Sequence, residues 1–190
     1  MATPVGHSLA GYLVFGWSDE AQGPRKARWL LLYICLANAA DLDFLPGILL
    51  GQPSLYHQGV SHSLGFALVV SLAVAGVCRL WGESFAAIFA LSCMAYVSHL
   101  VIDFFGTDTR PPFGMPILWP LGGAYYISPV PVFRGVHHAG AAVGSMLEWL
   151  LALFHPYNLG AIALEVVFLL PFVVLRLRRR YILLGPQRPG

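Results

Sequence analysis

Three long apolar stretches dominate the pattern of hydrophobic and polar positions along the chain. Residues 44–78 carry no charged side chain, and the second half of this stretch, residues 64–78, has the composition of a helix that ends at Arg79. Residues 84–102 are again free of charge, and residues 159–175 contain only Glu165 before a run of arginines begins. About 20 apolar residues are needed to cross the hydrocarbon core of a bilayer. The pattern therefore predicts membrane-spanning helices.

Shorter apolar runs surround these stretches, at residues 5–17, 29–40 and 141–154. Each is too short to span a bilayer alone, but each suits a helix packed inside a bundle, where protein shields its ends. Segments rich in polar, proline and glycine residues predict loops at residues 18–28, 51–59 and 106–134. We therefore expect one all-α domain over residues 1–190, an integral membrane helical bundle with about four spanning helices and shorter packed ones.

The composition indicates the same solvent. Hydrophobic residues make up 57% of the chain and charged residues 11%, whereas soluble domains average about 25% charged residues. The mean hydropathy is +0.69. A net charge of +2 gives no argument for nucleic-acid binding, so the expected partners are the lipid bilayer and a small substrate. The three cysteines lie in apolar runs, and we interpret them as packing residues.

Basic residues mark alternate helix ends. Arg28 precedes the helix expected at residues 29–40, and Arg79 lies between two long apolar stretches. Short loops rich in Lys and Arg favour the cytoplasmic side, so we expect both arginines inside, in a bacterial inner membrane. The helix directions then bring seven residues together near the outer face: His7, Asp41, Asp43, His57, His62, His99 and Asp103. A crossing by residues 141–154 would put the terminal arginines outside, so a re-entrant or interfacial segment fits better there.

His99 and Asp103 form the first pair with chemical meaning. They lie four residues apart on an apolar helix and therefore share one face. An ionisable residue inside a membrane helix indicates a functional site by default. A His–Asp hydrogen bond that locks two helices together is the alternative.

Two further pairs strengthen the pattern. Asp41 and Asp43 follow an apolar helix, and two carboxylates this close repel each other unless a cation or a proton lies between them. A solvated helix end is the alternative reading of this pair. His57 and His62 stand at the entry to a membrane helix and are either metal ligands or interfacial histidines without a role.

All seven residues together offer four imidazoles and three carboxylates, out of seven histidines and nine acidic residues in the chain. That mixture suits a divalent ion such as zinc, with manganese or iron as alternatives, better than copper(I). More than four candidate ligands indicates two ions, an arrangement used for phosphoester hydrolysis.

Four strings of the sequence, taken in order, resemble the YdjM-like membrane-bound metal-dependent hydrolases. They are A-D-L-D at 40–43, H-Q-G-V-S-H-S at 57–63, H-L-V-I-D at 99–103 and G-M-P-I-L-W-P at 114–120. The family pattern is expected to read P-D-[IL]-D, H-R-G-x-T-H-S, H-x-x-x-D and G-x-x-x-L-W-P, so Ala40, Gln58 and Ser61 depart from it. The missing arginine at position 58 would weaken phosphate binding if the family uses it so. The resemblance implies a hydrolase and names no substrate.

A more distant likeness is to the zinc-dependent phospholipase C and P1 nuclease group. Those all-helical proteins carry His, Asp, His and H-x-x-x-D around a zinc cluster, an order that recurs here as His7, Asp41, His62, His99 and Asp103. The later H-x-x-x-[DE] pair of that group has no counterpart, since His137 and His138 are too far from Glu148.

The expected chemistry is hydrolysis of a small or lipid-like phosphoester by metal-activated water, with Asp43 or Asp41 orienting the water or acting as general base. Arg110 and Arg134 are the candidates for binding a substrate phosphate. A non-enzymatic metal-binding protein or transporter is the main alternative, and a structural protein whose polar residues only pair helices is a third. Grouping of the candidate ligands at one helix end disfavours a conduction path. Four roles stay open: His137, His138, Glu148 and Glu165.

Overall fold

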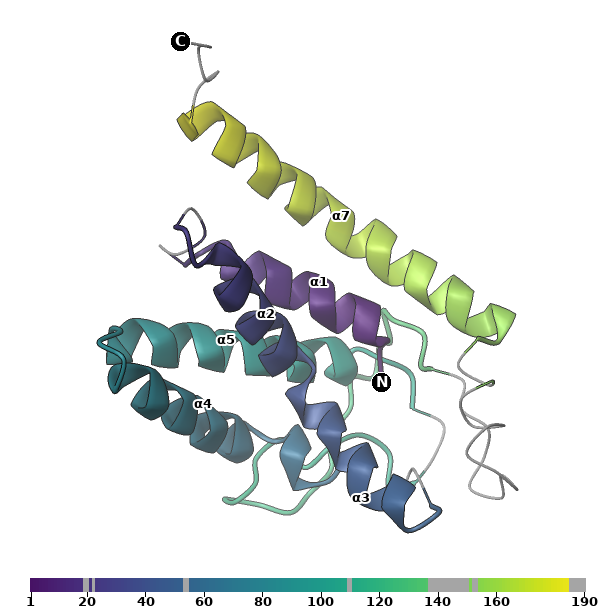
Figure 1. Ribbon diagram of the computed structural model, residues 1–190. Helices are drawn as coiled ribbons and strands as arrows, with labels where there is room; N and C mark the ends of the chain where they lie inside the picture. Colours follow the sequence, from purple (N-terminus) through teal and green to yellow (C-terminus); the bar gives the residue numbers. More distant parts are fainter. Residues whose placement is uncertain are drawn as a thin grey trace.

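The computed structural model describes residues 1–18, 21, 23–52, 55–108, 111–136, 151 and 154–184, and in these it is all-helical (Figure 1). Strands are absent from this part of the chain, which contains two isolated bridges, Gly106 with Phe133 and Met115 with Tyr126. The elements in order are α1 Pro4–Phe15, α2 Lys26–Ala37, η2 Ala39–Asp43, α3 Phe44–Leu49, η3 Val60–His62, α4 Leu64–Arg79, α5 Phe85–Phe104 and α7 Pro156–Leu184. The all-α prediction is confirmed for the described residues.

Hydroxyl side chains begin three of these helices. The side chains of Thr3, Ser63 and Ser84 accept backbone N–H groups in the first turns of α1, α4 and α5. Such caps satisfy amide groups that have no partner inside the helix. The Ser63 cap has a further consequence, because it fixes the start of α4 directly after His62.

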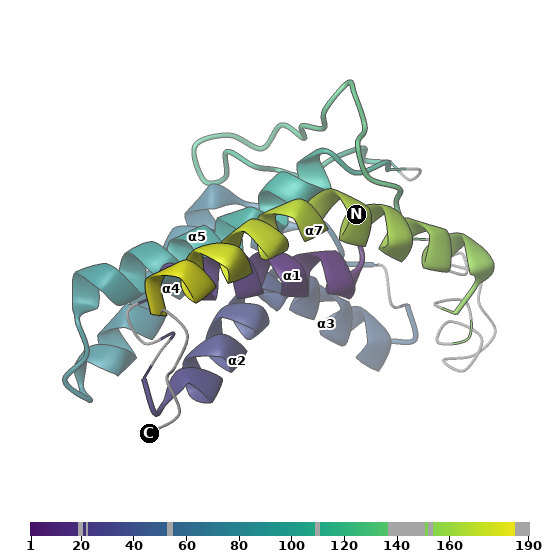
Figure 2. The same cartoon turned by 90° about the horizontal axis from the view of Figure 1, so that it is seen from above.

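The helices pack around α1, α2 and α5. Helices α4 and α5 form an antiparallel hairpin, α1 lies against both α2 and α5, and α7 packs on α1 (Figure 2). Trp29 and Tyr33 of α2 are fully buried in the main hydrophobic cluster. Close contact between α1 and α2 depends on Gly11, since a Cβ atom there would lie 2.7 Å from the carbonyl oxygen of Tyr33.

Among the described residues, two helices, α5 and α7, are long and apolar enough to cross a membrane. A third span is possible only if α2 and the Ala39–Leu49 segment count as one element, bent by 59°. The described part of the chain therefore contains two or three candidate spans, fewer than the expected four or so. The run at residues 64–78 does form a helix, but the 16 residues of α4 rise only about 24 Å, less than the bilayer core of about 30 Å. Most of the segment at 141–154 lies outside the described residues.

One end of the bundle carries the basic residues. The guanidinium of Arg28 lies 5.0 Å from the ring centroid of Trp81, and Arg25 forms an ion pair with Glu83. The start of α2 therefore lies beside the α4–α5 turn, as the charge pattern predicted. The seven His and Asp residues gather at the opposite end, on the first turn of α1, on η2, in the loop before η3, on η3 and on the last turns of α5.

The described part of the 106–134 segment is irregular, as expected, and it covers the start of α4. The carbonyl oxygens of Ile117 and Trp119 accept the N–H groups of Leu64 and Gly65, at 3.0 and 3.1 Å. Gly65 allows this close approach, since a Cβ atom there would lie 2.4 Å from the Trp119 oxygen. The G-M-P-I-L-W-P string thus supports the turn that carries His62.

Candidate metal centre

The centre is built on the last turn of α5. His99 and Asp103 lie one turn apart on one face of this helix, and both are buried. The distance between His99 Nε2 and Asp103 Oδ2 is 3.3 Å. The sequence spacing thus produces the shared face that was expected.

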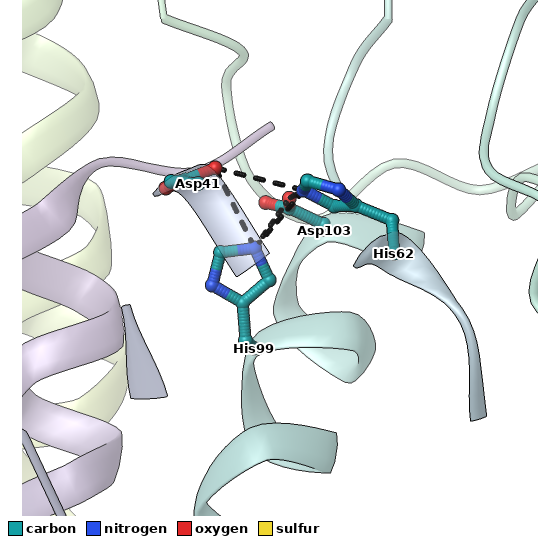
Figure 3. Close-up of side chains that lie close together, drawn as sticks. All are labelled: Asp41, His62, His99 and Asp103. Atoms are coloured by element: carbon teal, nitrogen blue, oxygen red, sulfur yellow. Dashed lines mark hydrogen bonds and ion pairs between the residues drawn. The ribbon is translucent and has the colours of Figure 1, made fainter. Parts of the chain in front are cut away.

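Two short 3-10 segments bring Asp41 and His62 to the same point, so that four side chains from three elements converge (Figure 3). His62 Nε2 lies 3.2 Å from His99 Nε2 and 3.6 Å from Asp103 Oδ2. Asp41 Oδ1 lies 3.5 Å from His62 Nε2 and 3.6 Å from His99 Nε2. Ligands at 2.0–2.1 Å around a tetrahedral zinc ion are about 3.3 Å apart. Five of the six distances among these four atoms therefore match the spacing of a tetrahedral set.

Hydrogen bonds on the far sides of the two rings decide which nitrogen faces the cluster. His99 Nδ1 lies 2.9 Å from the carbonyl oxygen of Ala37, which can only accept, so Nδ1 carries the proton. His62 Nδ1 lies 3.1 Å from Asp43 Oδ2 and donates to that carboxylate in the same way. In the neutral rings both Nε2 atoms then present lone pairs to each other at 3.2 Å. A cation between them removes the repulsion, and outer hydrogen bonds of this kind are a regular feature of metal-binding histidines.

Several buried polar atoms at this point have no hydrogen-bond partner. They are Asp41 Oδ1, Asp103 Oδ2, His57 Nε2 and both ring nitrogens of His7. Leaving a buried polar group unpaired is costly, and the cost is larger for a charge. A donor set of imidazole nitrogens and carboxylate oxygens suits zinc, manganese or iron. These residues therefore fit a divalent metal ion.

Asp43 occupies a different position from Asp41. Its Oδ1 accepts from His57 Nδ1 at 2.9 Å, while its Oδ2 accepts from the backbone N–H of Gln58 at 3.0 Å and the hydroxyl of Ser61 at 2.8 Å. With the His62 contact added, four donors surround one carboxylate. Asp43, His57 and His62 also lie close enough together to hold an ion, but these hydrogen bonds give Asp43 the contacts of a group that orients both rings.

The turn around Asp43 is held in an unusual backbone conformation. Gln58 has a φ of 61°, the only positive value among non-glycine residues in the described chain. Such left-handed residues are uncommon outside glycine and cluster at functional sites. Here the conformation directs the Gln58 N–H at the Asp43 carboxylate.

α1 supplies the seventh residue. The His7 ring stacks on His99 with the centroids 3.8 Å apart, and His7 Nε2 lies 3.4 Å from Asp103 Oδ1. The same Asp103 oxygen accepts the backbone N–H of Ala2 at 2.6 Å. All seven residues named from the sequence therefore lie in one connected cluster.

The cluster is almost closed to the outside. The side chains of His7, His62, His99 and Asp103 are fully buried, whereas that of Asp41 is 15% exposed. Access is therefore at Asp41.

Electrostatics in the cluster favour positive charge. Burial lowers the pKa of His62, but the hydrogen bonds that its ring donates to the Asp41 and Asp43 carboxylates outweigh burial and raise the pKa to about 9. Burial and the neighbouring His99 ring hold the pKa of His7 below its usual value. His62 thus binds a proton where a cation would otherwise lie, and His7 keeps a free lone pair.

The remaining candidates lie elsewhere. Arg134 is exposed, and its guanidinium lies 5.9 Å from the ring centroid of Tyr157, at the start of α7. Arg110, His137, His138 and Glu148 lie outside the described residues. Glu165 is buried against the start of α1 and is not part of the cluster.

Sequence reasoning missed two supporting groups. The hydroxyl of Tyr96 donates to the carbonyl oxygen of Ser61 at 2.9 Å and so ties α5 to the His62 turn. A tyrosine three residues before His99, on the same helix face, was the available signal. The Ala37 carbonyl that holds His99 had no signal, because any residue carries a carbonyl group.

Comparison with known families matches residues 1–183 to the family described as YdjM inner membrane protein. No curated protein and no solved structure matches the chain. The family description agrees with the two helices of spanning length.

Proposed function

This chain belongs to the YdjM inner membrane protein family, and we propose that it is a membrane-bound metal-dependent hydrolase of phosphoesters, with lipid-like substrates. The observation that carries the proposal is the convergence of Asp41, His62, His99 and Asp103 in one largely buried cluster with unpaired polar atoms. A purely structural zinc site has four closed ligands, whereas this cluster contains three further ionisable side chains.

The four converging residues would hold the first ion, and zinc is the proposed identity because of their tetrahedral spacing. When bound, it would lower the pKa of a water molecule from about 15.7 to about 7 and so supply hydroxide at neutral pH. A second ion is part of the proposal, with the unpaired nitrogens of His7 and His57 as its candidate ligands.

Asp41 and Asp43 have separate roles in this proposal. Asp41 is the more exposed of the two, with a side chain 15% accessible, and its unpaired Oδ1 faces His62 and His99 inside the cluster. It can bind an ion and accept a proton from the attacking water. Asp43 holds His57 and His62 through two of its four contacts and is itself fixed by the other two. This is a positioning role, proposed in place of the direct contact with water considered from the sequence.

Lipid-like substrates are proposed because exposed apolar side chains adjoin the site residues, two of which lie on a helix of membrane-spanning length. Large hydrophobic side chains adjoin the site residues in sequence and are exposed: Leu42, Leu45, Tyr56 and Val60. His99 and Asp103 lie in the last turns of α5, a helix of spanning length. A phosphate headgroup at the cluster would leave the acyl chains on this apolar surface. Arg110 and Arg134 remain the candidates for binding the phosphate.

The test is turnover of a panel of phospholipids, lipid phosphates and one soluble aryl phosphate ester in detergent, with and without a chelator. We expect hydrolysis of a lipid member that stops with the chelator and returns with zinc. Asp41→Asn and His62→Ala should lose it, while Glu83→Gln, the same acid-to-amide change at the opposite end of the bundle, should keep it. Metal-loaded protein that turns over no panel member would contradict the enzyme proposal and favour a metal-binding protein without catalysis.

A further inference from the structure

Glu165 is a buried acid that the proposed chemistry does not use. It lies in α7, within a helix of membrane-spanning length, and it is completely inaccessible. An acidic side chain in this environment is costly unless its oxygens are well paired. The partners of Glu165 therefore show what it stabilises.

Those partners are at the start of α1. Glu165 Oε1 accepts the backbone N–H of Thr3 at 2.7 Å, and Oε2 accepts the N–H of Gly6 at 3.0 Å and the hydroxyl of Thr3. A helix N-terminus has unpaired amide groups and a partial positive charge, so a carboxylate is favourable there. Glu165 thus caps α1 from a neighbouring helix.

Gly6 makes room for this cap. A Cβ atom at position 6 would lie 2.6 Å from Glu165 Oε2 and 2.9 Å from its carboxyl carbon. No side chain fits there unless the carboxylate moves. The close contact between α7 and α1 at this point therefore requires glycine at position 6 opposite Glu165.

The capped residues are also those next to the metal centre. Gly6 directly precedes His7, whose ring stacks on His99 and whose Nε2 faces Asp103. On the other side of Thr3, the Ala2 N–H donates to Asp103 at 2.6 Å. We propose that Glu165 is a positioning residue of the centre: by fixing Thr3 and Gly6, it holds His7 and the Ala2 amide against Asp103.

The other end of α1 offers a matched contact from the same helix. The Arg176 guanidinium donates to the carbonyl oxygens of Tyr12 and Leu13 and lies 4.7 Å from the ring centroid of Tyr12. A cation suits a helix C-terminus as a carboxylate suits the N-terminus. α7 therefore runs parallel to α1 and binds it at both ends (Figure 1), but only the Glu165 end adjoins His7.

The experiment compares Glu165→Ala, Glu165→Gln and Gly6→Ala with Arg176→Gln in the full chain. The main readout is the reaction of His7 with diethyl pyrocarbonate in metal-free protein, followed by mass spectrometry. We expect His7 to be protected in the wild type and in Arg176→Gln but reactive in Glu165→Ala and Gly6→Ala. The second readout is zinc affinity, and it rests on the proposed function. Zinc affinity should fall about 10–100-fold in Glu165→Ala, the size of effect seen when a residue that orients a metal ligand is lost.

Equal exposure of His7 in Glu165→Ala and Arg176→Gln would overturn the proposal, since Glu165 would then only dock α7. Continued protection of His7 in Glu165→Ala would overturn it as well. If Glu165→Ala does not fold, the reactivity of His7 in Glu165→Gln and Gly6→Ala, compared with that in Arg176→Gln, decides instead. A wild type that binds no zinc would contradict the proposed function alone, because His7 protection is measured without metal.

Discussion

Both ends of the bundle hold acidic and basic groups close together, but the two ends differ in how exposed these groups are and in what they pair with. At the end where α2 begins, the Arg25 side chain is 52% exposed, and its ion pair with Glu83 spans 3.0 Å at the surface. At the other end, three aspartates and four histidines lie together, four of them fully buried and three nearly so, and their ion pairs among the described residues involve no Lys or Arg.

The difference concerns what balances the charge. Water and an arginine balance Glu83, and such exposed pairs contribute about 0–1 kcal/mol to stability. Among the described residues, the ion-pair partners of Asp41 and Asp103 are imidazoles, whose charge depends on pH. We therefore expect the basic end to set the orientation in the membrane, while the acidic end has the properties of a binding site.

The largest expected effect concerns the two sides of the membrane. Single cysteines replacing Gln52, near the metal end, and Leu80, at the basic end, should react with an impermeant maleimide from opposite sides, because basic loops stay cytoplasmic. We expect Leu80→Cys to be labelled only after the membrane is opened. Both cysteines are introduced into a variant that lacks Cys35, Cys78 and Cys93, and this parent variant should show no maleimide labelling. Labelling of both positions from one side would refute the topology.

The next effect is the pH dependence of metal affinity. The pKa of His62 is about 9, so the ring is protonated at neutral pH in the metal-free protein and must lose that proton to bind an ion. Affinity should therefore rise with pH up to about 9, by about tenfold per unit from this residue. Zinc titration against a competing chelator should give a Kd about 100-fold weaker at pH 6 than at pH 8. An unchanged Kd over this range would contradict the assignment of His62.

A smaller effect is expected when the orienting carboxylate changes and the four converging ligands remain. Asp43→Asn keeps the size of the side chain but weakens the hydrogen bonds that fix His57 and His62, so zinc affinity should fall about 10–100-fold. Asp108→Asn, which alters a carboxylate that accepts the Gly114 N–H outside the cluster, is the matched control. A Kd reduced equally by both changes would argue against a specific role of Asp43.

The smallest effect is expected at the basic end. Glu83→Gln removes the charge from an exposed pair and should change the free energy of unfolding by less than about 1 kcal/mol. Metal content should stay at the wild-type value, measured on the same preparation. Loss of metal in this variant would show that the two ends are coupled and would contradict the separate roles assigned to them.

How far the sequence predicts this molecule depends on the range of each contact. The apolar runs predict α4, α5 and α7, and the spacing of His99 and Asp103 predicts their shared face, because both follow from helix periodicity. Charge at alternate helix ends predicts which ligands gather. The separate positions of Asp41 and Asp43 could not be predicted, since they depend on the 59° bend between α2 and the next segment.

Other features depend on contacts between distant segments. Glu165 was expected either to pair helices or to join the site, and its contact with Thr3 and Gly6, over 150 residues away, leaves no local pattern. The number of spans was overestimated because an apolar helix of 16 residues looks the same whether it crosses a bilayer or packs inside a bundle.

The central claim is that the buried His and Asp cluster binds metal, and elemental analysis of the purified protein tests it most directly. Wild-type protein and the variants His99→Ala, Asp103→Ala and Glu83→Gln would be purified without chelator, incubated with zinc and desalted. We expect at least one equivalent of zinc to remain in the wild type and in Glu83→Gln, and little in the two cluster variants. Equal zinc in all four proteins, or none in the wild type, would contradict the account.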